Sequence, residues 1–269
     1  MRAFNKIFRK AAYQQQLNND LFQAIQGGRL DRVVTLLQEG ADPEARGTLD
    51  DTPLIEAAYY GHMPIVEHLL SVGADRAARN DPGRNALFVA LCRQHEDIAL
   101  KLITAGVPVN ITDENRHTPL FTAVHQMRDN VVQHLADAGA DVNARSGEGW
   151  TALLKSINMR DERKIDILLK AGADPNAADP DGWTPLMYAA EHARIARKLL
   201  DHGADVHAVN ANGENILDIA RGRNLCDLIE MIEKNPAPDG LPAVMPESSP
   251  RAVKILKKIS FKNRTPAGR

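Results

Sequence analysis

The side chains that most often carry chemistry are scattered along this chain. Its nine histidines and its two cysteines, Cys92 and Cys226, do not occur at the spacings that bind zinc or build a catalytic dyad. No phosphate-binding loop, Gly-x-Gly-x-x-Gly, Gly-x-Ser-x-Gly or His-Glu-x-x-His is present. We therefore expect no catalytic residue, cofactor, metal or small-molecule substrate, and a protein that is not an enzyme.

The composition favours a globular protein built from helices. Of the 269 residues, 43% are hydrophobic and 25% are charged, but only 4% are aromatic. A core made mainly of Leu, Ile, Val and Ala suits helices better than a β-sandwich. There is no apolar run of about 18 residues and no apolar stretch after the N-terminal charges, so neither a membrane span nor a secretory signal is expected. Two distant cysteines fit a reducing compartment, and we expect a cytoplasmic protein.

Basic residues gather at the two ends of the chain. Residues 1–12 carry a charge of +4 and residues 251–269 carry +7, so within a total of −2 the body, residues 13–250, carries −13. Such a body repels a phosphate backbone. The distribution therefore argues against nucleic acid binding along the body.

Two short motifs recur with one period. Gly-Ala-Asp or a close variant begins at Gly40, Gly73, Gly106, Gly139, Gly172 and Gly203. Thr-Pro-Leu or a close variant begins at Thr52, Asn85, Thr118, Thr151, Thr184 and Asn215. In both series the spacing is 33 residues four times and then 31. Because two independent motifs share both the period and its shortening, the middle of the chain is a repeat array.

Each motif has a physical role in a unit of two helices. Thr or Asn is a favoured N-cap, because its side-chain oxygen accepts a hydrogen bond from a free backbone N–H group. Proline is the favoured first helical residue. The glycine ends the second helix in a left-handed conformation. The Asp, Asn and Gly residues between the two motifs predict a projecting loop, so one unit reads helix, turn, helix, loop.

The repeat resembles the ankyrin repeat family. The resemblance rests on the 33-residue period, the Thr-Pro-Leu starts, the Gly61-His62 turn and the Gly-Ala-Asp-x-Asn-Ala segments at 139–144 and 172–177. It implies an all-α, ankyrin-type solenoid of about seven stacked helix-turn-helix units over residues 20–233. Residues 1–19 are then a basic amphipathic N-terminal segment, 234–250 a Pro-rich linker and 251–269 a basic C-terminal tail.

The chain departs from the family pattern in two ways. The histidine that the family places after Thr-Pro-Leu is replaced at every unit, which adds apolar packing in most of them; the replacements are Ile55, Phe88, Phe121, Leu154, Met187 and Asp218. The sixth unit is two residues short near Glu191 and His192, where the Gly-His turn is missing. We expect this deletion to shorten a first helix.

The resemblance also implies where a partner binds. In ankyrin-like stacks, partners lie along a concave groove made by the loop tips and the ends of the first helices. Mapped by register, our candidate binding residues are Tyr59, Tyr60, Arg84, Arg93, His117, His125, Gln126, Trp150, Met159, Trp183 and His192. Adjacent rings at Tyr59 and Tyr60 cannot both enter the core. Trp150 and Trp183 share one register and are expected to be neighbours about 8–10 Å apart, although packing of one loop on the next explains them equally well.

The basic ends leave several interpretations open. Phe4, Ile7, Phe8 and Ala11 recur at helical spacing, as do Ala252, Ile255, Leu256 and Ile259. The N-terminal segment is either a capping helix on the stack or a contact to an anionic membrane or an acidic protein. The tail is either such a contact or disordered. Liposome pelleting with and without 1–12 and 251–269 separates these readings.

The sequence thus predicts a non-catalytic protein–protein interaction module, an adaptor, scaffold or inhibitor that holds a protein partner in its groove. The alternative is a peripheral membrane-associated scaffold anchored by its basic termini.

Overall fold

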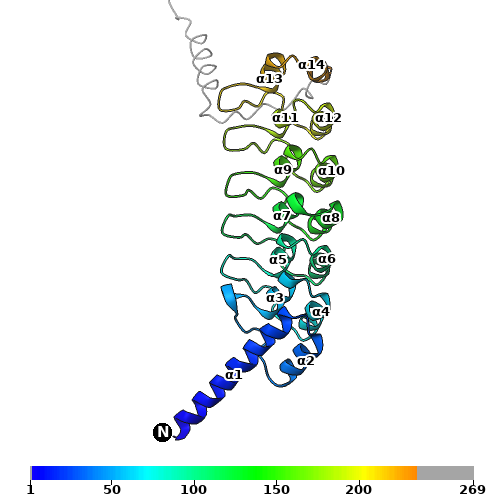
Figure 1. Cartoon of the computed structure of the whole chain (residues 1–269). Helices are drawn as coiled ribbons and strands as arrows, with labels where there is room; N and C mark the ends of the chain where they lie inside the picture. Colours follow the sequence, from blue (N-terminus) through cyan, green and yellow to red (C-terminus); the bar gives the residue numbers. More distant parts are fainter. Residues whose placement is uncertain (1, 235–269) are drawn as a thin grey trace, which may run out of the picture. The chain divides into compact units, whose positions relative to one another are not determined.

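The computed structural model describes residues 2–234, with the side chains of residues 10–234. In this part of the chain it contains fourteen α-helices in seven consecutive pairs and no strand (Figure 1). The pairs are α1 (Arg2–Gln26) with α2 (Leu30–Gln38), α3 (Pro53–Tyr60) with α4 (Met63–Ser71), α5 (Ala86–Cys92) with α6 (Glu96–Thr104), α7 (Pro119–Gln126) with α8 (Asp129–Asp137), α9 (Ala152–Asn158) with α10 (Glu162–Lys170), α11 (Pro185–Tyr188) with α12 (Ala193–Asp201), and α13 (Ile216–Gly222) with α14 (Cys226–Glu233). The all-α ankyrin-type solenoid predicted from the sequence is confirmed.

The helix starts follow the predicted caps. The side chains of six residues each accept a hydrogen bond from the backbone N–H group three residues on: Thr52, Asn85, Thr118, Thr151, Thr184 and Asn215. The recurring glycines behave as predicted too, and Gly73 and Gly172 both have a φ of 89°. These caps fix where six of the first helices begin and where six of the second helices end.

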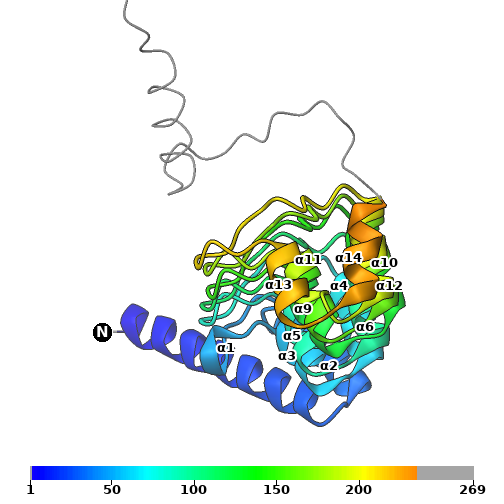
Figure 2. The ribbon, with the colours of Figure 1, turned by 90° about the horizontal axis from the view of Figure 1, so that it is seen from above.

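Within the stack, the units form three parallel columns. Viewed along the stack, the loops lie on one side, the first helices in the middle and the second helices on the other side (Figure 2). The loops join one another through backbone hydrogen bonds, such as Asp81 N–H to the Leu49 carbonyl (2.9 Å) and Gly147 N–H to the Asn115 carbonyl (2.9 Å). A single 3₁₀ turn, η1 (Thr48–Asp50), forms part of the first loop.

The core runs between the two helix columns and continues from one unit to the next. Leu87, Leu91 and Leu102 are fully buried in the third unit, and equivalent leucines fill the others. The apolar residues that replace the family histidine are buried in most units. Ile55 and Met187 pack in this core, while Phe88 is 1% exposed and Leu154 is fully buried. Full burial of such a side chain is worth about 1.5–3 kcal/mol.

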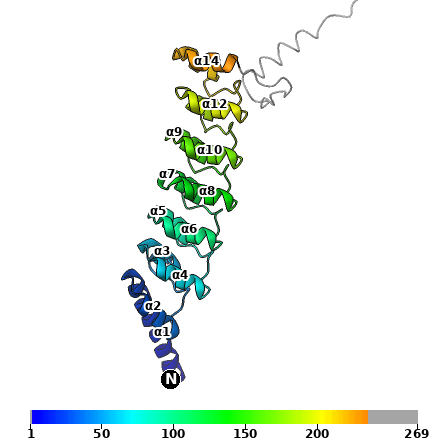
Figure 3. The same cartoon turned by 90° about the vertical axis from the view of Figure 1, so that its right-hand side faces the viewer.

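The second helices stack on one another along the array (Figure 3). Ion pairs link them across unit boundaries. Lys101 pairs with Glu67 (2.7 Å) and Lys198 with Asp166 (2.6 Å), while two longer pairs, Arg128–Glu96 (3.5 Å) and Arg163–Asp129 (3.7 Å), connect the units between them. These four pairs define the outer-face ladder. Each pair is at least partly exposed, so we expect it to contribute no more than about 1 kcal/mol.

Asparagine side chains tie the loops together from unit to unit. Asn110 donates to the Gly139 carbonyl (2.9 Å) and accepts from the Asp141 N–H group (2.8 Å). Asn143 and Asn176 repeat this pair of bonds in the next two units. One side chain thus satisfies both a carbonyl and an N–H group at the end of the neighbouring helix pair.

The long helix α1 corrects a boundary drawn from the sequence. Residues 2–26 form one uninterrupted helix, so residues 2–19 are not a segment separate from the repeats. Leu17 is 5% exposed and Leu21 is fully buried, so the core begins before residue 20. Gln14 donates to the Gly40 carbonyl (2.8 Å), and Asn18 accepts from the Asp42 N–H group (2.9 Å). In the first unit, two side chains of α1 therefore make the bonds that one asparagine makes elsewhere.

Two further boundaries concern the C-terminal end. The compact unit ends at Glu233, with the end of α14. The predicted Pro-rich linker, 234–250, and the predicted basic tail, 251–269, lie outside the described residues apart from Lys234.

Between residues 2 and 234, no helix is both long enough and apolar enough to cross a bilayer.

The sixth unit carries the expected shortened helix. α11 has four residues, whereas the other first helices that follow α1 have seven or eight. In the second unit, Gly61 is left-handed (φ 80°), and a Cβ atom there would lie 2.7 Å from the ring of His95. The sixth unit lacks this glycine and the residue before it. Its chain turns by a tight hydrogen bond from His192 N–H to the Ala189 carbonyl (2.8 Å).

We predict that the last two units open before the rest of the array. Because stability in a solenoid depends on the interfaces between neighbouring units, a first helix of one turn weakens the joint between the fifth and sixth units. Amide hydrogen exchange should be faster in residues 184–233 than in 118–172. Insertion of Asn-Gly between Glu191 and His192 restores the length of 33 and should slow exchange there. Uniform exchange across the array would mean that the tight turn costs no packing.

Candidate functional site: a groove between loops and first helices

The sequence-predicted residues gather on the side of the stack where the loops meet the ends of the first helices. Arg84, His117, Trp150 and Trp183 come from the loops. Tyr59, Tyr60, Arg93, His125, Gln126, Met159 and His192 lie at or just after the ends of the first helices. We call this surface the groove. It contains three clusters of side chains.

The first cluster, Tyr59, Tyr60 and Arg93, is exposed. The two tyrosine rings meet edge to face at 5.1 Å, and the guanidinium of Arg93 lies 4.5 Å from the centre of the Tyr59 ring. Tyr59 is 39% exposed and Tyr60 is 42% exposed, so neither ring enters the core, as predicted. Two aromatic rings and a cation in mutual contact on a surface are typical of interface anchors.

The second cluster surrounds a hollow of about 310 Å³ in the third to fifth units. Arg84, His117, His125 and Gln126, four of the predicted residues, line it together with Phe88, Cys92, Asp113, Phe121, Thr122, Glu148 and Lys155. The ring of His117 stacks on Phe121 at 5.0 Å, and the guanidinium of Arg84 lies over Phe88 at 5.4 Å. The walls of this hollow are therefore partly aromatic and partly charged.

Asp113 organises the loop above the hollow. Its Oδ1 accepts from the backbone N–H groups of Asn115 (3.0 Å) and His117 (2.9 Å), and its Oδ2 accepts from Nη2 of Arg84 (2.9 Å). The Asp113 side chain is 1% exposed. Nε of Arg84 is buried and has no hydrogen-bond partner among the described residues. One buried carboxylate thus closes its own loop and holds the arginine of the preceding loop.

Lys155 places a positive charge near His125 in the hollow. Burial lowers the pKa of His125, and the positive charges of Lys155 and Lys164 lower it further, so the imidazole is neutral at neutral pH. Burial raises the pKa of the Cys92 thiol despite the nearby charge of Arg84. A thiol with a raised pKa is a poor nucleophile, because the thiolate is the reactive form.

The third cluster is aromatic. The ring of Tyr188 lies 5.3 Å from that of Trp150 and 5.8 Å from that of Trp183, so a third ring contacts both tryptophans. The Tyr188 hydroxyl donates to Oδ2 of Asp179 (2.6 Å). Burial and this hydrogen bond raise the pKa of Tyr188, which keeps the phenol protonated. Trp183 packs against the core, while Trp150 stays half-buried on the loop.

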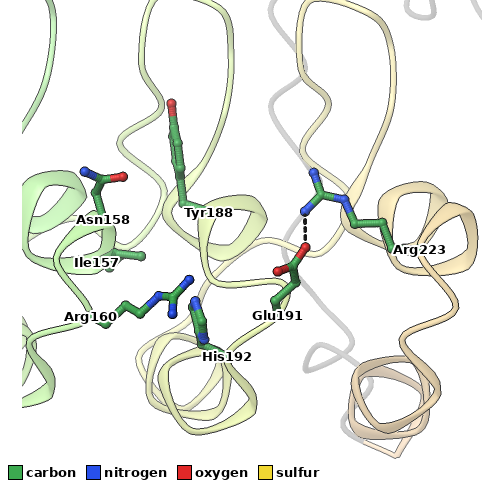
Figure 4. Close-up of a pocket in the computed structure, with 7 residues that line it drawn as sticks. All are labelled: Ile157, Asn158, Arg160, Tyr188, Glu191, His192 and Arg223. Carbon is green, nitrogen blue, oxygen red and sulfur yellow. Dashed lines mark hydrogen bonds and ion pairs between the residues drawn. The ribbon is translucent and has the colours of Figure 1, made fainter.

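A smaller hollow of about 140 Å³ lies next to Tyr188 and contains His192 (Figure 4). Arg160 points toward His192, and Glu191 pairs with Arg223 at 2.9 Å. In the second and third units the turn histidine bonds a backbone carbonyl of the preceding unit: Nε2 of His62 bonds the Gln26 carbonyl (3.3 Å), and Nε2 of His95 bonds the Tyr59 carbonyl (3.1 Å). His192 makes no such side-chain bond in the described structure, because the shortened unit displaces the turn. Met159 lines neither hollow and stands 39% exposed at the end of α9.

Sequence reasoning missed Asp113, Asp179 and Tyr188. The aspartates carried a signal, because a polar residue that accepts loop N–H groups recurs with spacings of 33, 33, 33 and 31 at Asn80, Asp113, Ser146, Asp179 and Asn210. Tyr188 carried none, since the equivalent residues of the preceding units, Thr122 and Lys155, are not aromatic.

Among residues 2–234, no group of three or more histidine, cysteine or acidic side chains is arranged to hold a metal ion.

Comparison with known proteins identifies the repeat. A family model described as "Ankyrin repeats (3 copies)" matches residues 21–113, 100–179 and 161–237. These matches together cover most of the chain. No curated protein matches the sequence.

We expect Asp113→Ala to destabilise the array by about 2–4 kcal/mol, because it removes two loop hydrogen bonds and leaves Arg84 without its carboxylate. Asp113→Asn can keep both loop bonds and loses the ion pair, so its cost should be about 1 kcal/mol. Urea unfolding followed by circular dichroism measures both. Glu148→Ala, at the exposed tip of the next loop, is the control and should change stability by less than about 0.5 kcal/mol. An equal, small effect of both alanine variants would refute the organising role of Asp113.

Lys155→Met should raise the pKa of His125. The ammonium of Lys155 disfavours the imidazolium, and its removal leaves burial and Lys164 as the remaining causes of the lowered pKa. Titration of the His125 ring signals by NMR measures the pKa. The titration runs from about pH 4.5 to about pH 8.5, which spans the ordinary range of histidine pKa values. Lys101→Met, which removes the same charge from the outer face, should leave this pKa unchanged. A pKa of His125 that does not respond to Lys155→Met would contradict this effect of the Lys155 charge.

Proposed function

Because the chain belongs to the ankyrin repeat family, we propose that it is a non-catalytic adaptor, scaffold or inhibitor that binds a protein partner along the groove. Ankyrin repeats are in general protein–protein interaction modules. The groove presents aromatic and cationic side chains that the fold holds in place, which supports its use as the binding surface.

The exposed cluster of Tyr59, Tyr60 and Arg93 carries this proposal. Most aromatic side chains of the described residues serve the core or the loops, but these two tyrosines are about two-fifths exposed and lie side by side. Two adjacent exposed rings form an apolar surface patch of the kind found at protein interfaces. Tyrosine and arginine are enriched among the residues that dominate binding energy at interfaces.

The contacts of α1 favour a cap over a membrane anchor. Gln14 and Asn18 complete the hydrogen bonds of the first loop, and Leu21 and Ile25 are buried in the core. The C-terminal half of α1 is therefore committed to the stack, as each end of a solenoid requires. This favours the groove over the basic N-terminal segment as the principal binding surface.

We expect Tyr59→Ala with Tyr60→Ala to weaken capture of the partner by about thirtyfold or more, equivalent to at least about 2 kcal/mol. Trp150→Ala with Trp183→Ala is the second test, and Trp150→Ala alone spares the core packing of Trp183. Affinity capture from a cell lysate followed by quantitative mass spectrometry compares the intact chain with each variant. Circular dichroism verifies that the helices persist.

The matched control is Val72→Ala, because Val72 is 47% exposed at the end of α4, in the second-helix column. Its capture profile should equal that of the intact chain. Unchanged capture by both groove variants would place the binding surface on the second-helix side or on the termini.

A further inference from the structure

Several charged side chains of the outer face form ion pairs across units, whereas three cations along the groove form none among the described residues. On the outer face, the ladder from Glu67 to Lys198 places a carboxylate beside each of its cations. Along the groove, Arg93, Lys155 and Arg160 make no ion pair with any carboxylate of the described residues. Arg93 is instead held by the ring of Tyr59.

The sequence of the groove floor explains this difference. The last residues of the first helices and the positions next to them in units three to five are Cys92, Arg93, His125, Gln126, Asn158 and Met159, and none is acidic. Two carboxylates line the larger hollow. Asp113 is buried and occupied by Arg84 and its own loop, and Glu148 stands exposed at a loop tip. The groove floor thus carries unpaired positive charges, although residues 13–250 as a whole have a net charge of −13.

The surroundings of His125 support the sign of this floor. Its pKa is lowered first by burial and then by Lys155 and Lys164, although Lys164 already pairs with Asp161 at 3.0 Å. A negative group that entered the hollow would be attracted to Lys155 and to the free donors of His125 and Gln126. The hollow is also walled by Phe88 and Phe121, which suits the aliphatic stem of a glutamate.

We infer that the floor of the groove, from Arg93 to Arg160, binds an acidic segment of the partner protein. This inference rests on the groove being the binding surface, as proposed above. A glutamate or aspartate side chain of that segment occupies the hollow beside Lys155, and neighbouring carboxylates pair with Arg93 and Arg160. The rings of Tyr59 and Tyr60 contact an apolar residue of the same segment.

A protein segment fits this floor better than a nucleic acid does. The loop tips that border the groove carry Glu114, Glu148 and Asp181, and the whole body is acidic. A polyphosphate backbone carries a charge at every residue and is repelled by those tips, whereas a peptide can place its few carboxylates on the floor alone.

The test selects random twelve-residue peptides, displayed on phage, for binding to the immobilised full chain. At ~3.3 Å per residue, a peptide of this length crosses several units. We expect the fraction of Asp and Glu in the enriched peptides to rise about twofold over the input library, as charge complementarity predicts. The dissociation constant of the best acidic peptide should rise about threefold to fivefold in Lys155→Met. Arg93→Gln, at an exposed position, should have a similar effect.

Lys101→Met is the matched control, because it also removes one positive charge but from the outer-face ladder, and it should leave the affinity unchanged. Enriched peptides without an excess of acid, or an equal loss in Lys101→Met, would overturn the acidic partner. In that case the groove itself still stands if Tyr59→Ala with Tyr60→Ala abolishes the selection. If the intact chain enriches no peptides beyond those that the double variant enriches, both proposals are overturned. A twelve-nucleotide oligothymidylate, with ~12 negative charges, is the nucleic acid control. If it binds more tightly than the best peptide, the inference of an acidic protein segment is overturned.

Discussion

Side-chain hydrogen bonds between the helix ends of neighbouring units set the geometry on which the rest of this stack depends. Each of Asn110, Asn143 and Asn176 binds both a carbonyl and an N–H group of the next unit, which sets that unit at a fixed distance and rotation. Helix pairs of this length bury too little surface to be stable alone, so each needs its neighbour in that position. Units that lack this asparagine have to supply such bonds by other means, as Glu44 does for the Asp75 N–H group. Gln14 and Asn18 of α1 do so for the first unit.

The fold could be read from the sequence because its local signals repeat. A threonine cap, a proline after it and a glycine at the helix end are each weak alone, but six copies at a constant period leave little ambiguity. The continuity of α1 could not be read in this way, because residues 2–19 match no repeat and their only signal was helical spacing. The short α11 was foreseen from the missing residues near Glu191, because a deletion inside a strict period must fall on an identifiable element.

The groove was harder to predict, because it depends on contacts between units. Register placed the candidate residues on one surface, but it could not show that Tyr188 contacts both tryptophans or that Asp113 holds the arginine of the preceding loop. The contacts across unit boundaries, Tyr188 with Trp150 and Asp113 with Arg84, pair residue types that do not recur at the equivalent positions of other units. Charge behaves similarly. The total of −2 and the acidic body gave no hint of an electropositive floor, which appears only when Arg93, Lys155 and Arg160 are compared with the paired charges of the outer face.

The regular spacing of the units also sets the distance between the side-chain clusters of the groove. The exposed tyrosines of the second unit and the aromatic cluster of the fifth and sixth units are separated by a whole number of repeats, each about 8–10 Å thick, the distance between packed helices. The separation of the two clusters is therefore set by the number of units between them, and gain or loss of one unit changes it by about 8–10 Å. A partner that touches both must match this separation, so the array selects its ligands by their span as well as by their side chains.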